Sequence, residues 1–444
     1  MRLMPANPFA IYPYQWPILN PGPSWSVPRI SMPRFFSIQW DFQIDSWYYI
    51  GHGVDAAGNA YTFNFTVGRY AFNGQSPSPQ MAYFGFGVGS EAANEFHFGV
   101  GYGLDVSDDP KRPAALLIPP VGDFAYDLLF NGMLGANHAR FRYTGGQPVG
   151  IIGAMYSIDA VGIDKNKVPL SASLELRDDR GTVLEGMSGC VAPLAEDDPG
   201  VYTYEVAQPR LTITGGTIRI GSETVVLTGG SLWHDRQAYT YSPYAPKLAA
   251  LSGGSDEERI AAGASAASTL YRGMWLNVKL DSGPSMILSP MWAPQSQPGQ
   301  QWISGRLVDR PPTGGYGNLF FAPDSALFKA GDGGAFLQGG DTNPATPWDF
   351  DVNIFDPGDP SLSPHWQSSD GPRNTYGTKW SVRFSERVQQ WGVPPIVYLV
   401  ALVESCENSL QGSVPFWEGA VRVYKDAACT EAIGYGFVEQ MGYN

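Results

Sequence analysis

Cysteine and histidine are scarce in this chain of 444 residues, which contains 3 Cys and 5 His. The cysteines form no CxxC pair and are too few for a disulfide framework, so we expect buried free thiols. The histidines are scattered, with no HExxH or HxH spacing, so no zinc site is expected. The sequence therefore predicts neither a metal nor any other cofactor.

Charged residues are also few, at 16% of the chain against roughly 25% in an average globular protein. The formal net charge is −14, and no basic run is present, so nucleic acid and anionic membranes are poor partners. No stretch approaches the ~20 apolar residues that a membrane span needs. The first 23 residues are rich in proline and lack the apolar segment of a signal peptide. If Met1 is the native start, a cytoplasmic location is expected.

Signatures of several enzyme classes are missing. The sequence has no GxSxG elbow, no nucleotide fingerprint and no glycine-rich loop that opens a helix. The glycines of residues 85–89 lie in strand-like sequence and are not a phosphate-binding loop. Serine-hydrolase and nucleotide-dependent chemistry therefore find no support.

Short alternating segments dominate what is present. Residues 61–67 and 95–100 alternate apolar and polar side chains with the period of two of a half-buried strand. Hairpins are predicted around Gly215-Gly216, around residues 178–181 and around residues 281–283. Strands at short spacing without intervening helices are typical of an antiparallel sandwich or barrel, so the fold class is all-β.

Chain length predicts more than one core. A chain of 444 residues exceeds the usual size of one domain. Residues 246–269 are rich in Ala, Gly and Ser, and we interpret them as a linker that includes the start of a short helix at residues 256–270. The predicted domains are residues 1–245 and 270–444.

Four segments, in order, resemble one family. They are residues 39–53 (QWDFQIDSWYYIGHG), residues 230–237 (GSLWHDRQ), residues 273–283 (GMWLNVKLDSG), and residues 416–423 (FWEGAVRV) with 434–443 (GYGFVEQMGY). Together they are similar to the motifs of the AttH-like and carotenoid-hydratase-like lipocalin proteins. Gln237 stands where that family commonly has an acid, and Met441 where it usually has Thr.

This resemblance implies two lipocalin-like, calycin-type β domains packed together, with a ligand cavity in or between them. It extends to tocopherol-cyclase-like proteins and to fungal Diels–Alderases. These relatives act on apolar polyene-like or isoprenoid-like molecules without a metal or redox cofactor. Fold alone does not fix function, so the site residues need their own argument.

The central motif offers three candidate catalytic residues, Asp235, Gln237 and His234, and a candidate substrate-binding residue, Trp233. In a strand, Trp233, Asp235 and Gln237 share one face, and His234 lies on the other. If the first face points into a barrel, Asp235 is desolvated and becomes a proton donor near neutral pH. The alternative is a structural Asp235 that pairs with Arg236.

The first motif adds an aromatic pair. Trp47 and Tyr49 share a face, and Trp47 is expected to close one end of a barrel and contact substrate. Tyr49 is expected to line the cavity, where its hydroxyl holds a substrate carbonyl. Asp41 and Asp45 precede this strand, and we interpret both as solvated loop acids.

The last motif places Trp417 and Glu418 on opposite faces of a strand. A buried acid must be paired, and Arg422 is the expected partner of Glu418. Trp275 in the third motif and Trp417 are candidate substrate-binding residues, as is Glu418. The indole rings of Trp275 and Trp417 can stabilise a carbocation or simply fill a core.

These residues support two classes of function. The first is a cofactor-free enzyme that cyclises or isomerises an apolar substrate, or that hydrates or dehydrates it. The sequence shows no second acid–base residue beside Asp235, which favours cyclisation or isomerisation. The second is a carrier of an apolar ligand without turnover. The sequence leaves the oligomeric state open.

Overall fold

The computed structural model describes sixteen stretches of the chain and most of its strands. The described residues are 34–39, 44–71, 80–109, 111, 114–118, 127–132, 137–184, 190–191, 203–239, 272–292, 301–308, 334–338, 350–353, 365–368, 375–408 and 416–441. The predicted linker at 246–269 and the predicted helix at 256–270 lie outside them.

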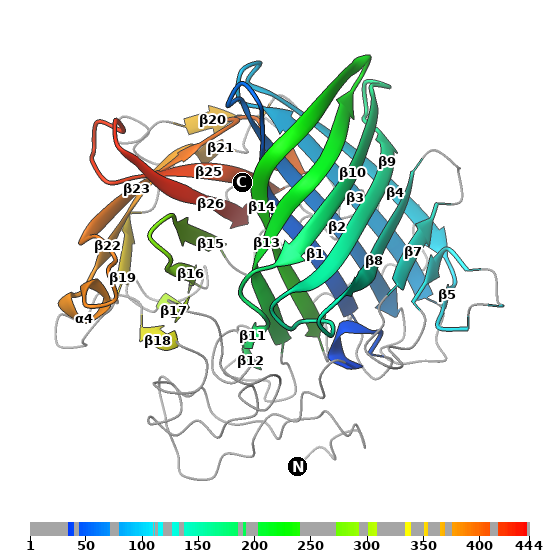
Figure 1. Ribbon diagram of the computed structural model, residues 1–444, viewed down its shortest axis with the longest axis horizontal. Coiled ribbons are helices and arrows are strands. Elements are labelled where there is room, and N and C mark those ends of the chain that lie inside the picture. The colour runs from blue at the N-terminus through cyan, green and yellow to red at the C-terminus, as the bar shows by residue number, and fades with distance from the viewer. Residues whose placement is uncertain are drawn as a thin grey trace, which may run out of the picture.

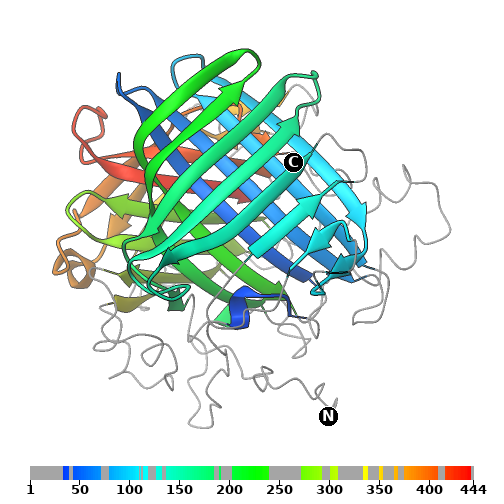
Figure 2. The same ribbon diagram turned by 45° about the vertical axis from the view of Figure 1, so that its right-hand side comes forward.

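The first sheet contains every described strand up to Tyr239. Its order is β4-β3-β2-β1-β14-β13-β10-β9-β8-β7-β6-β5, with β11 and β12 also paired to β13. Figure 2 shows these long strands as one strongly curved wall. The bounds are β1 Ile44–Asp55, β2 Ala60–Ala71, β3 Gln80–Ser90, β4 Glu95–Leu104, β5 Val106–Ser107, β6 Leu116–Leu117, β7 Asp127–Asn131, β8 His138–Gly146, β9 Ala154–Ile163, β10 Pro169–Asp178, β11 Val183–Leu184, β12 Cys190–Val191, β13 Thr203–Ile220 and β14 Glu223–Tyr239.

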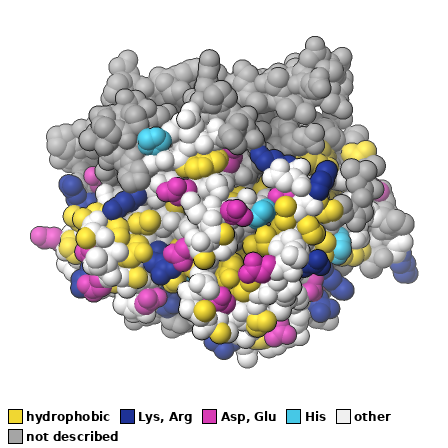
Figure 3. All heavy atoms as spheres, turned by 90° about the horizontal axis from the view of Figure 1, so that it is seen from above, with side chains coloured by type: hydrophobic (Ala, Val, Ile, Leu, Met, Phe, Trp, Pro, Cys, Tyr) yellow, Lys and Arg dark blue, Asp and Glu magenta, His cyan; other side chains and the backbone are white. Residues whose placement is uncertain are grey.

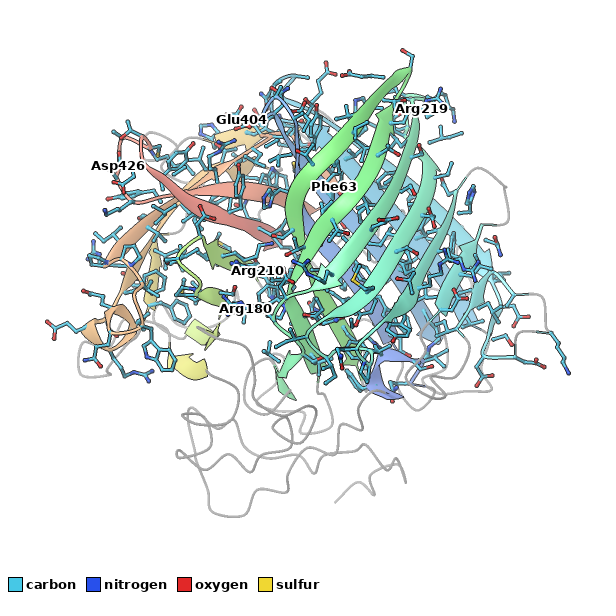
Figure 4. All side chains as sticks on the ribbon, in the orientation of Figure 1. Phe63, Arg180, Arg210, Arg219, Glu404 and Asp426 are labelled. Atoms are coloured by element: carbon cyan, nitrogen blue, oxygen red, sulfur yellow. The ribbon has the colours of Figure 1, made fainter. Side chains whose placement is uncertain are left out.

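This sheet closes almost completely into a barrel. Its edge strand β4 reaches β9 through an isolated bridge between Gly99 and Asp164. His97 on β4 supports the seam, because its Nδ1 lies 2.9 Å from Asp164 Oδ2. The interior is packed with buried aromatic and aliphatic side chains, among them Phe63, which Figure 4 labels.

The second sheet is built from the C-terminal strands and forms a half-barrel. Its order is β18-β17-β16-β15-β26-β25-β23-β22-β19, with β24 paired to β25. A separate pair joins β20 to β21, and a 3-10 helix (η1, Arg34–Phe36) and α4 (Glu386–Gln389) complete the described elements. The bounds are β15 Arg272–Leu280, β16 Ser285–Trp292, β17 Gln301–Val308, β18 Gly334–Gln338, β19 Phe350–Asn353, β20 His365–Gln367, β21 Thr375–Gly377, β22 Lys379–Phe384, β23 Ile396–Ala401, β24 Glu407–Asn408, β25 Phe416–Tyr424 and β26 Ala432–Met441.

These sheets confirm the predicted fold class, and they correct two predicted hairpins. Residues 178–181 do not form a hairpin, because the strands on either side, β10 and β11, both pair with β13 and not with each other. The hairpin around residues 281–283 joins β15 to β16 as expected. Gly215-Gly216, however, is not a turn, because β13 continues through it to Ile220 and the chain reverses at Gly221-Ser222. Gly216 has φ +150° and lies where β10 and β13 shift register, so the glycines form a bulge.

The two sheets pack directly on each other. Figure 1 shows β25 and β26 beside β14, at the side of the barrel. The Ala420 backbone N–H on β25 donates to Thr62 Oγ1 on β2 at 2.8 Å, and Arg422 forms an ion pair with Glu91 at 2.7 Å. Figure 4 labels Arg210 and Arg180 on the side of the barrel that faces β15 and β16. The outer face of β1 and β2, and of the part of β13 and β14 that the second sheet covers, is therefore buried, whereas the far end of β14 is open, with Val226 63% exposed.

Neither the described helices nor the charges on the described surface indicate a membrane or nucleic-acid partner. In the part of the chain that the structure describes, no helix is both long and apolar enough to cross a membrane. On the face shown in Figure 3, acidic side chains are scattered among neutral and basic ones.

Candidate active site

The central motif lies on β14 and faces the second sheet. His234 and Arg236 point into the barrel, so the alternate residues Trp233, Asp235 and Gln237 point out of it. These three side chains share one face, as the alternation predicts. However, this face is the outer face of the barrel, so the expectation that Trp233, Asp235 and Gln237 point into the barrel was wrong. They are desolvated all the same, because the second sheet covers them.

The covering strands supply the opposite wall. On β15, Trp275 is paired with Glu439 of β26, and Asn277 is paired with Phe437. Glu418 of β25 lies directly opposite Glu439 in the antiparallel register. Side chains directly opposite each other on one face have Cβ atoms about 4.5–5.5 Å apart, so these two carboxyl groups are close neighbours.

Four carboxyl groups meet in this layer. Asp235 and Glu205 lie on the barrel, on adjacent strands β14 and β13, while Glu418 and Glu439 lie on the second sheet. Burial raises the pKa of Asp235 well above its usual range, and the nearby Glu205 and Glu439 raise it further. Burial and Glu439 likewise raise the pKa of Glu418. Burial and Glu205 raise the pKa of Glu439 to about 7. The cluster therefore retains protons near neutral pH.

Hydrogen bonds to these carboxyls come from amides. Gln237 Nε2 donates to Asp235 Oδ2 at 2.5 Å, whereas Asp235 Oδ1 is buried and has no hydrogen-bond partner among the residues that the structure describes. Glu418 Oε2 accepts hydrogen bonds from Asn64 and Asn408. The two amides take the place of the cation that a buried carboxylate would normally need.

Three of the four carboxyl groups have no cationic partner among the described residues. Within the described stretches, no Lys or Arg forms an ion pair with Asp235, Glu418 or Glu439. The expected Glu418–Arg422 pair is wrong, because Arg422 binds Glu91 instead. Asp235 does not pair with Arg236 either, since that guanidinium lies inside the barrel on Asp45. The described side chains also form no group of His, Cys, Asp or Glu that could hold a metal ion.

Two indole rings flank the carboxyl groups. Trp233 and Trp275 meet edge to face, with ring centroids 5.7 Å apart and planes at 83°. Both Nε1 atoms are buried without a hydrogen-bond partner among the described residues. Tyr48 on β1 is paired with Asp235, and burial raises the pKa of its hydroxyl. An apolar wall with unpartnered donors beside a protonated acid suits an unsaturated ligand that carries a few oxygens.

The other sequence candidates lie elsewhere. Tyr49 and His234 stack inside the barrel, with ring centroids 4.2 Å apart, on the far side of the sheet from Asp235. Burial lowers the pKa of His234 well below its usual range, so its imidazole is neutral. Trp47 is fully buried there too, and its Nε1 donates to the Phe36 carbonyl at 2.9 Å. The structure thus separates Tyr49, His234 and Trp47 from Asp235 and Gln237.

Trp417 is also separated from the carboxyl cluster. It lies on the opposite face of β25 from Glu418, as alternation predicts, and packs on Trp380 with ring centroids 5.5 Å apart. Its Nε1 donates to the Glu404 carbonyl at 2.7 Å. Trp417 therefore fills the core of the half-barrel.

Several residues of this layer did not emerge from the sequence as site candidates. Glu205 and Asn64 come from β13 and β2, which none of the four motifs covers. Tyr48 lies inside the first motif, but on the opposite face from Trp47 and Tyr49. A stronger signal existed on β15, where Asn277 and Lys279 alternate with apolar residues and share the face of Trp275. The same alternation places Glu439 on one face with Tyr435 and Phe437.

Inside the barrel, His234 ends a buried polar chain that gives a testable pH dependence. Its Nδ1 lies 2.6 Å from Gln208 Oε1, and Gln208 Nε2 donates to Asp178 Oδ2 at 2.6 Å and to the Tyr156 hydroxyl at 2.9 Å. Burial raises the pKa of Asp178 from 3.8 to about 6. An acid whose pKa is raised by folding stabilises the protein below its unfolded pKa and loses this contribution as pH rises through the folded one.

We expect the replacement Asp178→Asn to gain stability relative to the wild type as pH rises from 4 to 8. The gain is about 3 kcal/mol in the free energy of unfolding, from a shift of about two pKa units. Urea unfolding at each pH measures it. The exposed Asp159→Asn is the control, with a constant difference. A flat difference for Asp178→Asn would contradict a buried, protonated Asp178.

Comparisons with known proteins show the fold alone. No protein-family model matches the chain, and no curated protein matches it in sequence. The chain is similar to the crystal structure of a protein assigned as an AttH from Nitrosomonas europaea, with a TM-score of 0.56 at 15% identity, over 94% of this chain and 97% of that one. It is also similar to kievitone hydratase from Nectria haematococca, with a TM-score of 0.53 at 14% identity, over 93% of this chain and 94% of that one.

Proposed function

We propose that this protein is a cofactor-independent hydro-lyase that adds water to, or removes it from, an apolar unsaturated molecule held between the two sheets. The observation that carries the proposal is the pair of neighbouring acids Asp235 and Glu439, both with raised pKa values, beside the indoles of Trp233 and Trp275. The structural likeness to kievitone hydratase, a hydratase by name, is consistent with it.

The chemistry requires a donor and an acceptor of protons. In hydration, protonated Asp235 gives its proton to one alkene carbon, and a cation develops on the other. A water molecule adds to that carbon and gives its proton to ionised Glu439. The proton then returns to Asp235, so alkene and water become an alcohol with both acids restored. Dehydration is the reverse.

The surroundings favour this assignment of roles. Asp235 has one unpartnered oxygen, Oδ1, while Gln237 fixes the other. Glu439 has a pKa of about 7, so both of its protonation states are populated at neutral pH. The π faces of Trp233 and Trp275 can stabilise the developing cation. Because a second acid–base residue is present, hydration is now favoured over cyclisation.

Cyclisation or isomerisation remains the second candidate, supported by the same two indoles. Such reactions need only the proton donor and an aromatic wall, and holding a flexible chain in a reactive conformer supplies much of the rate. The outcome differs in mass, because cyclisation leaves the substrate mass unchanged and hydration adds one water.

The experiment that tests the proposal is incubation of the purified protein with unsaturated apolar extracts in ¹⁸O-labelled water, followed by mass spectrometry. We expect a product heavier by one labelled water, or loss of water from an added tertiary alcohol. Conversion at unchanged mass would support the cyclase instead. Enrichment of a compound on the protein without conversion would identify a carrier and overturn the enzyme proposal.

A further inference from the structure

A buried lysine lies at the other end of the layer between the sheets. Lys279 is on β15, four residues beyond Trp275 on the same face, and is 3% exposed. Its Nζ donates to the Ser231 carbonyl of β14 at 3.2 Å. Four strand residues span about 13 Å, so Lys279 lies on the order of 10 Å from the carboxyl cluster.

No carboxylate in the described stretches forms an ion pair with Lys279. The nearest titratable groups are His52 of β1, Arg210 of β13, Arg422 of β25 and Tyr435 of β26. Behind them lie Arg180 and Asp281, which act on Arg210, and Asp281 also acts on Tyr435. Arg422 is already neutralised by Glu91. Burial and the charge of Arg210 lower the pKa of Lys279 well below its usual range. The ammonium form therefore needs a negative partner that these strands do not provide.

Unpartnered polar atoms gather around this lysine. Both side-chain atoms of Asn277 and the hydroxyl of Ser285 are buried without a hydrogen-bond partner among the described residues. Asn277 is 0% exposed, and Ser285 is directly opposite Lys279 on β16. His52 stacks on Tyr435 with ring centroids 3.7 Å apart, and its Nδ1 is unpartnered as well.

A purely structural role does not explain these groups. One backbone carbonyl uses only one of the three N–H donors of a lysine. Each buried polar atom without a partner lowers the stability of the fold, a cost that an apolar residue at the same position would avoid. Their convergence on one spot indicates a ligand group that accepts several hydrogen bonds and carries negative charge.

We propose that Lys279, Asn277 and Ser285 form an anion-binding subsite that holds a carboxylate or phenolate oxygen of the substrate. The apolar body of the molecule then lies along Trp275 and Trp233, with its double bond at the carboxyl cluster. This orientation rests on the proposed function, whereas the anion subsite itself does not. The substrate class is an unsaturated, amphipathic acid or phenol whose anionic oxygen lies on the order of 10 Å from the reacting carbon.

The binding of such an anion also restores the charge of the lysine. The ligand supplies the missing negative partner, so Lys279 takes up a proton as the complex forms. His52 and Tyr435 face the same spot, but burial keeps the His52 pKa low, and the neighbouring Lys279, Arg422 and Arg210 lower it further. Proton uptake is therefore assigned to Lys279.

The test compares two probes of equal length, farnesoate and farnesol, by calorimetry in buffers of different ionisation enthalpy. We expect the wild type to bind farnesoate about 10–100-fold more tightly than farnesol, the value of a hydrogen bond to a charged group, with proton uptake. Lys279→Met should abolish both the preference and the proton uptake, and Asn277→Asp should reverse the preference by repulsion. The exposed Lys425→Met is the matched control and should behave as the wild type.

Thermal unfolding of each variant confirms that the comparison uses folded protein. Equal binding of the two probes by the wild type, failure of both to bind, or a preference that persists in Lys279→Met would each overturn the subsite. An anion preference without any product in labelled water would leave the subsite intact and contradict only the hydro-lyase proposal. If Lys279→Met converts substrate as well as the wild type does, and the wild type shows no anion preference, the hydro-lyase proposal would stand and the anion subsite would be overturned.

Discussion

Replacement of Asp235 by Asn is expected to lower kcat by about 10²–10⁴-fold, the usual contribution of a general acid, with little change in ligand affinity. Asparagine keeps the size of the side chain in its place between the sheets but cannot give a proton to a carbon. A carrier would lose neither affinity nor function on this change. Turnover and equilibrium binding, measured on the same preparation, separate the two classes.

The pH profile gives this prediction a second readout. The donor must be protonated, and the pKa values of both Asp235 and Glu439 are raised, that of Glu439 to about 7. Because Glu439 must be ionised to accept a proton from water, activity of the wild type is expected to rise as pH rises through about 7, and to fall where Asp235 loses its proton. Residual activity of Asp235→Asn should lack this fall.

The matched control is Asp351→Asn, which removes an exposed acid of the second sheet. It should leave kcat unchanged. Glu439→Gln should also lower kcat, because it removes the group that accepts a proton from water. A loss in Glu439→Gln without a loss in Asp235→Asn would contradict the assignment of Asp235 as the donor.

Replacement of Asp45 by Asn should produce the largest loss of stability. Asp45, at the start of β1, is fully buried and forms ion pairs with Arg69 and with Arg236, both also 0% exposed. Arg236 further binds the carbonyls of Phe35 and Ser37, so this group fastens the segment at residues 34–39 to the barrel. The interpretation of Asp45 as a solvated acid was wrong, whereas Asp41 lies outside the described residues.

Removal of this carboxylate leaves two buried guanidinium groups without a counter-charge. Breaking a buried ion pair by loss of one partner costs about 3–5 kcal/mol, measurable as a lower midpoint of urea unfolding. Asp127→Asn, which breaks the half-exposed pair with Arg140, is the control and should cost under about 1 kcal/mol. Equal losses in the two variants would show that Asp45 does not neutralise both arginines.

Part of the candidate site follows from the sequence, and part does not. The alternation in residues 233–237 placed Trp233, Asp235 and Gln237 on one face, and the structure has them so. It also separated Trp417 from Glu418, as observed. The alternation could not predict which residues surround Asp235. Glu205, Glu439 and Trp275 are distant from it in sequence and meet it only when β15 and β26 cover β14.

The sequence by itself determined the strands and the two faces of each, because a period of two is a property of the extended chain. Only the tertiary structure decided which face lines the barrel and which faces the second sheet. Where β1 and β14 carry these residues, both faces are buried, so the alternation alone does not distinguish Tyr49 and His234, inside the barrel, from Asp235, outside it. The raised pKa values have the same origin, since desolvation and like-charge proximity appear only when the sheets pack.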